Sequence, residues 1–482
     1  MLNWHMRRQF IIAPTAMDID GPTSIDWGKW RVHLGEEATA ELRGNVCFIG
    51  RAADVDTAEP VTATSLDLLH TAGGLRRVVD FTDQMAGRFL VLIADGDTLW
   101  AVPDGWASLQ TFWHRLDGGG TVLTSSPGLM LDLGLGRGDR TDPERTGADR
   151  TKRGLEYRSA GPWCPVSGAR RLRANHLLDL TDGAERPRSL RRSPTGFRYL
   201  TAAIGRAIEG LQRSHGGETW LPITAGFDSR WLALAVAEAG LKANFFTFVT
   251  PGRASIDAEI GARIARRLGA EHAAIDMPSS VSDAVRAEVT AVRGAWRDLD
   301  KMAEIEFFST RPERPLVLNG NGGEILRGGY YGGGPRLPGR LALRGLCLGS
   351  TVSPFDGRGF DHWYRSALSR PEGREVALDE LFYWEQRMAH WGSEFYAEKE
   401  NHVDELSPFC CRRFLLAGPA VLGRRNALPV AGELAAQGVF EGIPVNPEEP
   451  GSRTGALRRV AVVRSIGNTI RAARRPPARR PG

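Results

Sequence analysis

The segment Leu-Pro-Ile-Thr-Ala-Gly-Phe-Asp-Ser-Arg, residues 221–230, decides the fold of this 482-residue chain. An apolar run at Trp220–Ile223 predicts a strand, and a mostly apolar run at Arg230–Ala239 predicts a buried helix. Small residues fill the turn between them. Backbone N–H groups at a helix N-terminus point at a ligand and the helix dipole favours negative charge, so the turn predicts an anion-binding site.

Three polar side chains in this segment would strengthen such a site. Thr224 and Ser229 would add hydroxyl donors, and Asp228 would hold a Mg²⁺ beside bound phosphates. The alternative is an ordinary strand–helix turn in which Asp228 and Ser229 cap the helix. The segment by itself leaves both interpretations open.

Strands alternate with helices on both sides of the segment. Three further strands are predicted at Asn244–Val249, Ala273–Ile275 and Pro315–Leu318. Helices are predicted at Tyr199–Gln212, residues 256–268 and Val281–Trp296. This alternation favours a parallel sheet with helices on its faces, and the remainder to about residue 450 looks helical.

The N-terminal part has a different pattern. Short apolar runs such as Phe89–Ala94 and Thr98–Val102 are separated by Asp-Gly turn signals, which predicts a β-rich region over residues 1–133. Residues 134–160 are polar and turn-rich, as in a loop or linker, and His176–Leu180 predicts a further strand of the first domain. The predicted division is residues 1–192, residues 193–450, and a basic tail at 451–482 that is disordered in part.

A glycine-rich segment follows the last predicted strand: Asn-Gly-Asn-Gly-Gly-Glu-Ile-Leu-Arg-Gly-Gly-Tyr, residues 319–330. Its first three glycines would let the backbone approach a nucleotide. The alternative is a glycine-rich surface loop. Ligands of α/β sheets bind at the carboxyl ends of strands, which is where both segments are expected.

The two segments resemble the loop Ser-Gly-Gly-x-Asp-Ser and the later Gly-Glu-Gly-x-Asp-Glu-x-x-Gly-Gly-Tyr of the asparagine-synthetase-like, PP-loop ATP pyrophosphatases. Thr224 stands where that family has Ser, and Gly226, Asp228 and Ser229 match the family loop. The resemblance implies that these four residues bind the pyrophosphate of ATP. Ala225 replaces the first glycine of the family loop.

The resemblance also implies a metal pair. Glu324 falls where the family has its second metal-binding Asp, so Asp228 and Glu324 would hold Mg²⁺ and act in catalysis. Asn321 replaces a glutamate that assists incoming ammonia in asparagine synthetases. Because a neutral amide cannot take a proton, this role is not expected here.

Nucleotide contacts are implied at four further positions. Gly320 and Gly322 would lie against the nucleotide, and backbone groups of Phe248 and Val249 would hydrogen-bond the adenine. The last assignment has an alternative, since any α/β sheet has such a strand end.

The family steadies its phosphorus transition state with a late lysine. No lysine follows Lys399 in this chain, so an arginine would supply the charge. Arg453 is the predicted replacement, with Arg424 and Arg425 as alternatives.

The first domain resembles the class II glutamine amidotransferase domain, which has an Ntn fold. The resembling stretches are Met85–Val91, Val102–Trp106, Thr124–Pro127 and Arg171–Leu180. That domain hydrolyses glutamine with a cysteine exposed when the first Met is removed. Here residue 2 is Leu, and the first cysteine, Cys47, lies inside a strand-like run. The implied domain is a degenerate one that makes no ammonia.

The predicted fold class is therefore α/β, with an N-terminal β-rich, Ntn-like domain and a C-terminal parallel-sheet PP-loop synthetase domain that ends in a helical region. The implied function is an ATP- and Mg²⁺-dependent ligase that adenylates a carboxylate, releases pyrophosphate and forms an amide bond with an amine. β-Lactam synthetases and lasso-peptide cyclases share this architecture, so the substrate would be a small molecule or a precursor peptide. The alternatives are an asparagine synthetase and a non-catalytic, nucleotide-binding pseudo-ligase.

Composition excludes several other classes. No apolar stretch approaches the roughly 20 residues that span a bilayer, and the N-terminus does not resemble a signal peptide. Five irregularly spaced cysteines do not form a disulfide framework, which favours a reduced, cytoplasmic protein. The net charge is +5, and no acidic residue follows Arg453. A solvated basic tail is the favoured interpretation over a nucleic-acid-binding one.

Overall fold

The structure, a computed structural model, describes most of the chain. The described residues are 4, 8–136, 160–164, 166–193, 196–251, 255–293, 299–328, 330, 340–348, 354–372, 375–422 and 429–446. The predicted linker at 134–160 and the predicted tail at 451–482 therefore lie almost wholly outside them. In the described part of the chain, no helix is both long enough and apolar enough to cross a membrane.

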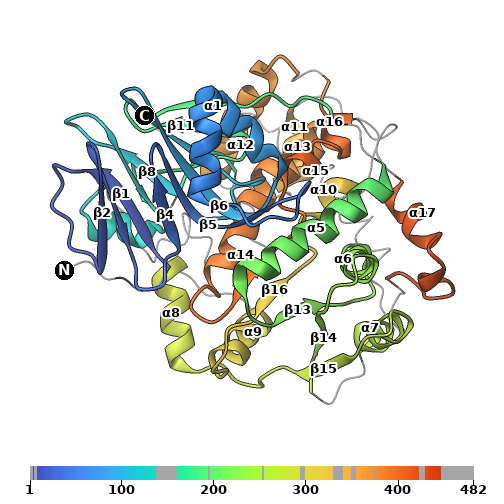
Figure 1. Cartoon of the computed structure of the whole chain (residues 1–482). Coiled ribbons are helices and arrows are strands. Elements are labelled where there is room, and N and C mark those ends of the chain that lie inside the picture. Colours follow the sequence, from blue (N-terminus) through green and yellow to red (C-terminus); the bar gives the residue numbers. More distant parts are fainter. Residues whose placement is uncertain are drawn as a thin grey trace, which may run out of the picture.

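Two six-stranded antiparallel sheets form the N-terminal part (Figure 1). The first has the order β10 (Arg170–Arg171), β8 (Phe112–Arg115), β9 (Thr121–Thr124), β1 (Phe10–Pro14), β3 (Trp30–Leu34), β2 (Thr23–Trp27). The second has the order β12 (Ala184–Pro187), β11 (His176–Asp179), β7 (Thr98–Pro103), β6 (Met85–Asp95), β5 (Val46–Asp54), β4 (Ala40–Arg43). Apolar side chains of both sheets, among them Phe10 and Leu92, share one buried cluster, so the sheets pack face to face.

Helices cover the outer faces of these sheets. Helix α1 (Ala63–Phe81) packs on the second sheet, and the short helix α2 (Pro127–Asp132) contributes Leu129 to a cluster on the first. The sequence did not predict α1. The reason is visible at Gly73 and Gly74, whose backbone angles leave the helical region and interrupt the helix at its middle. The predicted β-rich region, and the predicted pairing of the 176–180 strand with it, are confirmed.

A five-stranded parallel sheet forms the second part of the chain (Figure 1). Its order is β15 (His272–Asp276), β14 (Asn244–Val249), β13 (Thr219–Pro222), β16 (Leu316–Leu318), β17 (Asp404–Leu406). The helices that connect or flank these strands are α5 (Phe197–His215), α6 (Phe227–Glu238), α7 (Ile256–Arg267), α8 (Asp283–Arg293), α9 (Leu299–Ser309) and α10 (Gly323–Arg327). The predicted parallel sheet is confirmed, and the fold is of the mixed α/β class.

The prediction of a wholly helical C-terminal region is wrong at residues 404–406, which form strand β17. Two of its three residues are acidic, and all three are buried. Arg8 pairs with Asp404, and Lys399 pairs with Glu405. Buried acids of this kind need such partners, and one of them, Arg8, is far from Asp404 in the sequence.

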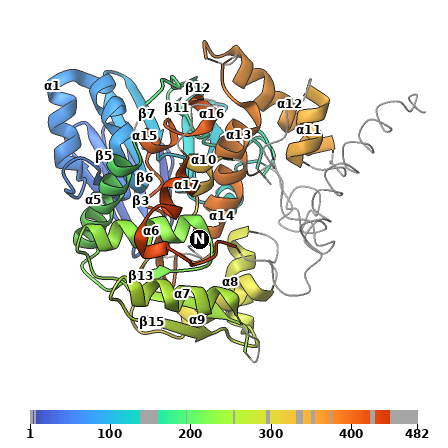
Figure 2. The same cartoon turned by 90° about the vertical axis from the view of Figure 1, so that its right-hand side faces the viewer.

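The C-terminal region is otherwise helical, as predicted. It contains α11 (Arg340–Leu348), α12 (Pro354–Ser369), α13 (Leu378–Phe382), the π-helix η2 (Tyr383–Gly392), α14 (Ser393–Ala397), α15 (Arg412–Leu415), α16 (Pro419–Leu422), α17 (Val430–Ala435) and the 3₁₀ turn η3 (Gly438–Phe440). Figure 2 shows α11 and α12 far from the parallel sheet and α17 beside α6.

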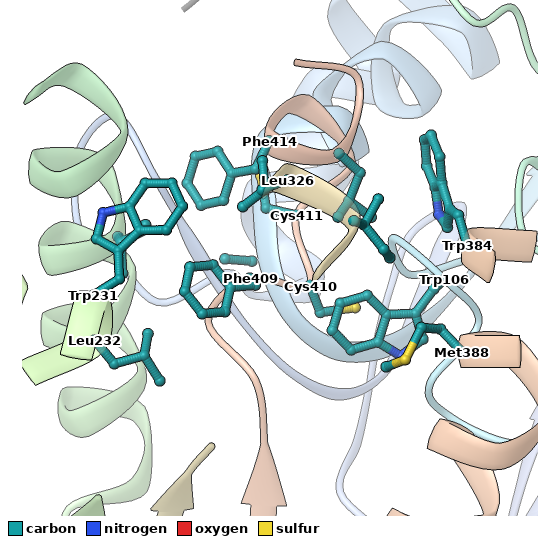
Figure 3. Close-up of a cluster of buried hydrophobic side chains, with 14 of the residues drawn as sticks. Trp106, Trp231, Leu232, Leu326, Trp384, Met388, Phe409, Cys410, Cys411 and Phe414 are labelled. Atoms are coloured by element: carbon teal, nitrogen blue, oxygen red, sulfur yellow. The ribbon is translucent and has the colours of Figure 1, made fainter. Parts of the chain in front are cut away.

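One buried cluster runs from the antiparallel sheets into the parallel one. It includes Ala53 and Trp106 from the first part and Trp231 and Phe409 from the second (Figure 3). Helix α5 lies at the boundary, and a Cβ at Gly210 would come within 2.6 Å of the Ala53 Cβ. The two parts therefore share one core.

Candidate functional site

The strand order reverses between β13 and β16, because β14 and β15 lie on one side of β13 while β16 and β17 lie on the other. In open α/β sheets, ligands bind outside the carboxyl ends of the strands at such a point. The loop after β13 carries residues 223–226, and the loop after β16 carries residues 319–322. These are the two segments that the sequence singles out, and the fold brings them together.

The loop after β13 is held by its own hydroxyl groups. The Thr224 backbone N–H donates to Ser229 Oγ at 3.1 Å, and the two hydroxyl oxygens are 3.1 Å apart. The Gly226 N–H donates to Thr224 Oγ1 at 3.2 Å, and the Ala225 N–H donates to the Asp257 carboxylate at 2.7 Å. Ala225 is buried and is not among the described residues with a positive φ, so its methyl group causes no backbone strain.

Helix α6 begins directly after this loop. Its N-cap is Gly226, and no side chain caps it. The alternative in which Asp228 and Ser229 serve only as caps is therefore wrong, since Ser229 bonds back to Thr224 and Asp228 lies in the first helical turn. The helix N-terminus remains available to an anion.

Asp228 and Glu324 face a common cation, the side chain of Arg327. Its Nε lies 3.1 Å from Asp228 Oδ1, and its Nη2 lies 3.2 Å from Asp228 Oδ2, a two-pronged ion pair. The same Nη2 lies 3.9 Å from Glu324 Oε1. Among the described residues, the buried Glu324 Oε2 has no hydrogen-bond partner. The two predicted metal ligands therefore meet at one place, and a cation lies between them.

Burial makes both carboxylates costly to ionise. Burial, together with the charge of Asp228, raises the pKa of Glu324 to about 7. Burial also raises the pKa of Asp228 above its ordinary value, although the charge of Arg327 opposes that rise. Paired acids with raised pKa values at a sheet edge are typical of functional sites.

The donor set fits Mg²⁺, which proteins commonly bind through one or two carboxylates together with substrate phosphates. Among the described residues, no group of three or more His, Cys, Asp or Glu side chains gathers to hold a metal. The Asp228–Glu324 pair alone would thus leave coordination positions for phosphate oxygens and water. The unpartnered oxygen of Glu324 is the observation in favour of this fit.

The glycines after β16 allow the backbone of this loop to lie close to Asp228 and to the Trp106 ring. A Cβ at Gly323 would lie 2.4 Å from Asp228 Oδ1, and one at Gly320 would lie 3.0 Å from the Asp228 Cβ. Gly322 has a φ of +87°, and a Cβ there would lie 2.4 Å from the Trp106 ring. Gly320 and Gly323 thus let the loop reach Asp228, and Gly322 lets Trp106 of the first part pack against it. Their predicted contacts with a nucleotide stay predictions.

A buried polar network that the sequence did not predict holds the same loop. Asn319 donates its amide to Glu405 at 2.7 Å, and the Tyr396 hydroxyl donates to Asn319 Oδ1 at 3.0 Å. Glu405 also accepts from the Lys399 ammonium at 2.7 Å, and Glu304 accepts from it at the same distance. The Lys399 ammonium lies over the Phe395 ring, 3.6 Å from its centre. The charges of Glu304 and Glu405 raise the Lys399 pKa although burial by itself lowers it.

Asn321 is held by this network too. Its backbone N–H donates to Asn319 Oδ1 at 3.0 Å, and its carbonyl accepts from the Ser407 hydroxyl at 2.7 Å. Its side-chain amide lies 3.4 Å from the Tyr396 hydroxyl. These contacts do not test a role of Asn321 toward ammonia. They show that Asn321 helps to hold the loop after β16 in place.

The remaining predicted site residues lie in different surroundings. Phe248 and Val249 end β14, and the Phe248 ring packs edge-on against Phe307. Arg453, Arg424 and Arg425 lie outside the described residues. The described chain ends at Asn446, whose N–H donates to the Ala225 carbonyl at 3.1 Å. The chain is thus held against the candidate anion loop shortly before Arg453.

Aromatic side chains border the carboxylate pair. Tyr330 and Tyr383 lie with their ring centres 4.2 Å apart. Burial and the nearby charge of Glu324 raise the Tyr383 pKa well above its ordinary value. Tyr383 is the first residue of η2, and π-helical turns are frequent at functional sites.

Comparisons with known proteins complete the description. No family model matches the sequence, and no curated protein matches it. Among solved structures, 26 chains match. One, the allosteric regulatory enzyme of purine biosynthesis, is 11% identical over 65% of this chain and 69% of that chain, with a TM-score of 0.24. Another, glutamine phosphoribosylpyrophosphate amidotransferase from B. subtilis complexed with ADP and GMP, is 13% identical over 68% of this chain and 71% of that chain, with a TM-score of 0.20. At these TM-scores the similarity carries no functional conclusion.

Proposed function

We propose that this protein is an ATP-dependent ligase of the asparagine-synthetase-like type, which activates a carboxylate by adenylation and couples it to an amine. The observation that carries the proposal is the meeting of Asp228 and Glu324 at the reversal point of the parallel sheet. This pair lies beside the uncapped N-terminus of α6. An anion site next to an acidic pair is what the phosphates of a metal-bound nucleotide require.

In this proposal, each loop has a separate task. Thr224, Gly226 and Ser229 bind the pyrophosphate part of ATP through their N–H groups and hydroxyls. Asp228 and Glu324 hold Mg²⁺, which supplies positive charge to the departing pyrophosphate. The nucleotide base lies at the ends of the neighbouring strands, against backbone groups of Phe248 and Val249. Gly320 and Gly322 lie against the nucleotide and carry no side chain that would obstruct it.

The chemistry follows in two steps. An oxygen of the substrate carboxylate attacks the α-phosphorus of ATP, and the bond to the β-phosphate oxygen breaks, which releases pyrophosphate. The amine then attacks the acyl carbon and AMP leaves. The protein contributes mainly position and charge, since it aligns the carboxylate with the α-phosphate and stabilises charge as it develops. Arg453 stays the predicted cation for the phosphorus transition state.

The amine does not come from glutamine hydrolysis in this proposal. Residue 2 is Leu, and all five cysteines are buried. Burial raises the pKa of the first of them, Cys47, to about 12, so its thiol is a poor nucleophile. Free ammonia or an amino group of the substrate is the remaining source. Glutamate release above a no-enzyme control, lost on replacing a cysteine, would contradict this part.

The test is exchange of radiolabelled pyrophosphate into ATP, with pooled small carboxylic acids and carboxylate-bearing peptides as substrates. We expect carboxylate-dependent exchange by the wild type and none by Asp228→Asn. Exchange that persists unchanged in Asp228→Asn would reject this site. ATP binding without exchange for any pool would favour the second candidate.

That second candidate is a nucleotide-binding pseudo-ligase. The ion pair between Arg327 and Asp228 favours it, because the guanidinium occupies one of the two predicted metal ligands. Ala225, in place of the family glycine, favours it as well.

A further inference from the structure

Arg327 has a position that the proposed ligase function does not by itself explain. It is the last residue of α10, and its guanidinium makes two parallel contacts with the Asp228 carboxylate. The same group lies over the ring of Phe227, the first residue of α6, at 5.8 Å from the ring centre. The cation therefore lies beside both the acidic pair and the first residues of α6, where phosphates would bind.

The guanidinium of Arg327 opposes the binding of a metal ion as long as it stays on Asp228. The ionised pair of Asp228 and Glu324 carries two negative charges, and Arg327 neutralises one of them. A divalent cation that binds Asp228 would lie within a few ångströms of the guanidinium, and two cations repel strongly in a half-buried site. The phosphates of a nucleotide would remove this repulsion, because they offer the guanidinium a second set of oxygens.

Arg327 is also free enough to change partners. Its side chain keeps 28% of its surface exposed, and Gly328, with a φ of +70°, follows it at the helix end. Arg230 provides a contrast, because that side chain is buried and is held by the carbonyl groups of Ile443 and Pro444. The Arg230 side chain is therefore fixed by its surroundings, whereas the Arg327 side chain is partly exposed to solvent.

We propose that Arg327 is a displaceable counter-ion: it blocks Asp228 against divalent cations until nucleotide phosphates draw the guanidinium away, so that metal and nucleotide bind together. The proposal rests on the proposed function, because it needs a nucleotide at the N-terminus of α6. It makes Arg327 a positioning residue for the metal.

The first test uses Mn²⁺ as the probe and requires no nucleotide. The full-length protein is titrated with Mn²⁺, and free Mn²⁺ is measured by electron paramagnetic resonance. We expect weak binding by the wild type and binding about tenfold tighter or more by Arg327→Gln. Arg327→Lys should stay close to the wild type because its ammonium keeps the charge. Arg76→Gln, which removes an exposed arginine of α1 far from the site, is the matched control. Equal Mn²⁺ affinity in wild type and Arg327→Gln would overturn the proposal.

The second test compares the wild type with and without nucleotide, so its main result does not depend on the folding of a variant. Mn²⁺ binding is measured with and without α,β-methylene-ATP through the relaxation rate of water protons, which reports Mn²⁺ bound to protein. We expect the analogue to tighten Mn²⁺ binding to the wild type about tenfold or more, and to add little in Arg327→Gln. If the analogue binds without tightening Mn²⁺ binding, the proposed displacement of Arg327 from Asp228 by nucleotide phosphates is wrong. If the analogue does not bind at all, the proposed function fails, and the nucleotide-free comparison still judges whether Arg327 blocks Asp228.

Discussion

The loop after β13 and the loop after β16 meet at one edge of the parallel sheet, but they are held by different means. The first is held by hydroxyl groups of its own segment, Thr224 and Ser229, and by one carboxylate, Asp257. The second is held by a buried charged network that ends at Asn319 and by the Trp106 ring.

In the proposed function, this difference would separate a ligand-binding loop from a supporting one. Neutral hydrogen bonds contribute about 1 kcal/mol each and the one to the Asp257 carboxylate about 1.5–3 kcal/mol, so the donors of the first loop are able to turn to a ligand at modest cost. Buried ion pairs cost far more to break, so we expect the second loop to be rigid and to keep Glu324 beside Asp228. Changes in the first loop should therefore alter binding, and changes under the second should alter stability.

The largest effect is expected at the acidic pair. Asp228→Asn or Glu324→Gln should lower carboxylate-dependent pyrophosphate release by about a hundredfold or more, because loss of a metal ligand removes several kcal/mol of charge stabilisation. Both variants should keep the wild-type melting temperature within a few degrees. Asp80→Asn, at an exposed position of α1, is the control for a lost carboxylate. Unchanged ATP affinity in both variants, measured by calorimetry, would remove the metal assignment.

The next effect is expected under the second loop. Lys399→Met should destabilise the fold by about 3–5 kcal/mol, since Glu304 and Glu405 would stay buried without their shared cation. Lys242→Met, at an exposed position, should change the free energy of unfolding by less than about 0.5 kcal/mol. Denaturant titrations of both variants make the comparison. A small effect at Lys399 would mean that the network does not support the loop.

Gly322 tests the contact between the two parts of the chain. Gly322→Ala should cost about 2–5 kcal/mol, because it adds left-handed backbone strain and overpacking against Trp106. Gly240→Ala is matched, since Gly240 has a φ of +65° and open space around it, and it should cost only about 1–2 kcal/mol. Equal costs in the two variants would show that the Trp106 contact is unimportant.

A smaller effect is expected from pH. The pKa of Glu324 is raised to about 7 by burial and by Asp228, so the folded protein holds its proton over a range in which the unfolded chain releases it. This contribution to stability is present below about pH 4.5 and is lost as the pH rises to about 7, on the order of 1–3 kcal/mol. Without metal, Glu324→Gln should therefore lose less stability than the wild type between pH 5 and pH 8. Parallel pH dependence of unfolding in the two proteins would contradict the raised pKa.

The smallest effect is expected at Ala225. Ala225→Gly should change turnover modestly and cost less than about 1 kcal/mol of stability, because the methyl group is tolerated and glycine loosens the loop. If instead the wild type releases no pyrophosphate and Ala225→Gly does, the natural protein is a pseudo-ligase.

Local patterns in the sequence predicted the parallel sheet and the meeting of its two loops, because a strand, a turn of small residues and a helix leave a pattern within a few residues. The antiparallel first part was predicted for the same reason. Helix α1 was missed because Gly73 and Gly74 interrupt its pattern, and β17 was missed because two of its three residues are acidic and one of them, Asp404, pairs with the distant Arg8.

The candidate site was predicted in part. Asp228 was identified from its place in the strand–turn–helix segment and Glu324 from the family resemblance, and the fold brings the two to one place. Arg327, Lys399 and Glu405 were not predicted, since their contacts with Asp228, Glu304 and Asn319 respectively join segments far apart in the chain. Arg327 stood in the quoted segment 319–330, and its charge beside Glu324 was the available signal.

The most direct test is a crystal structure of the protein with Mn²⁺ and α,β-methylene-ATP, in which anomalous scattering locates the metal. The account predicts one anomalous peak bonded to the Asp228 and Glu324 carboxylates and to phosphate oxygens at the N-terminus of α6. Arg327 should have left Asp228. A nucleotide bound elsewhere, or a metal peak that touches neither carboxylate, would contradict the account.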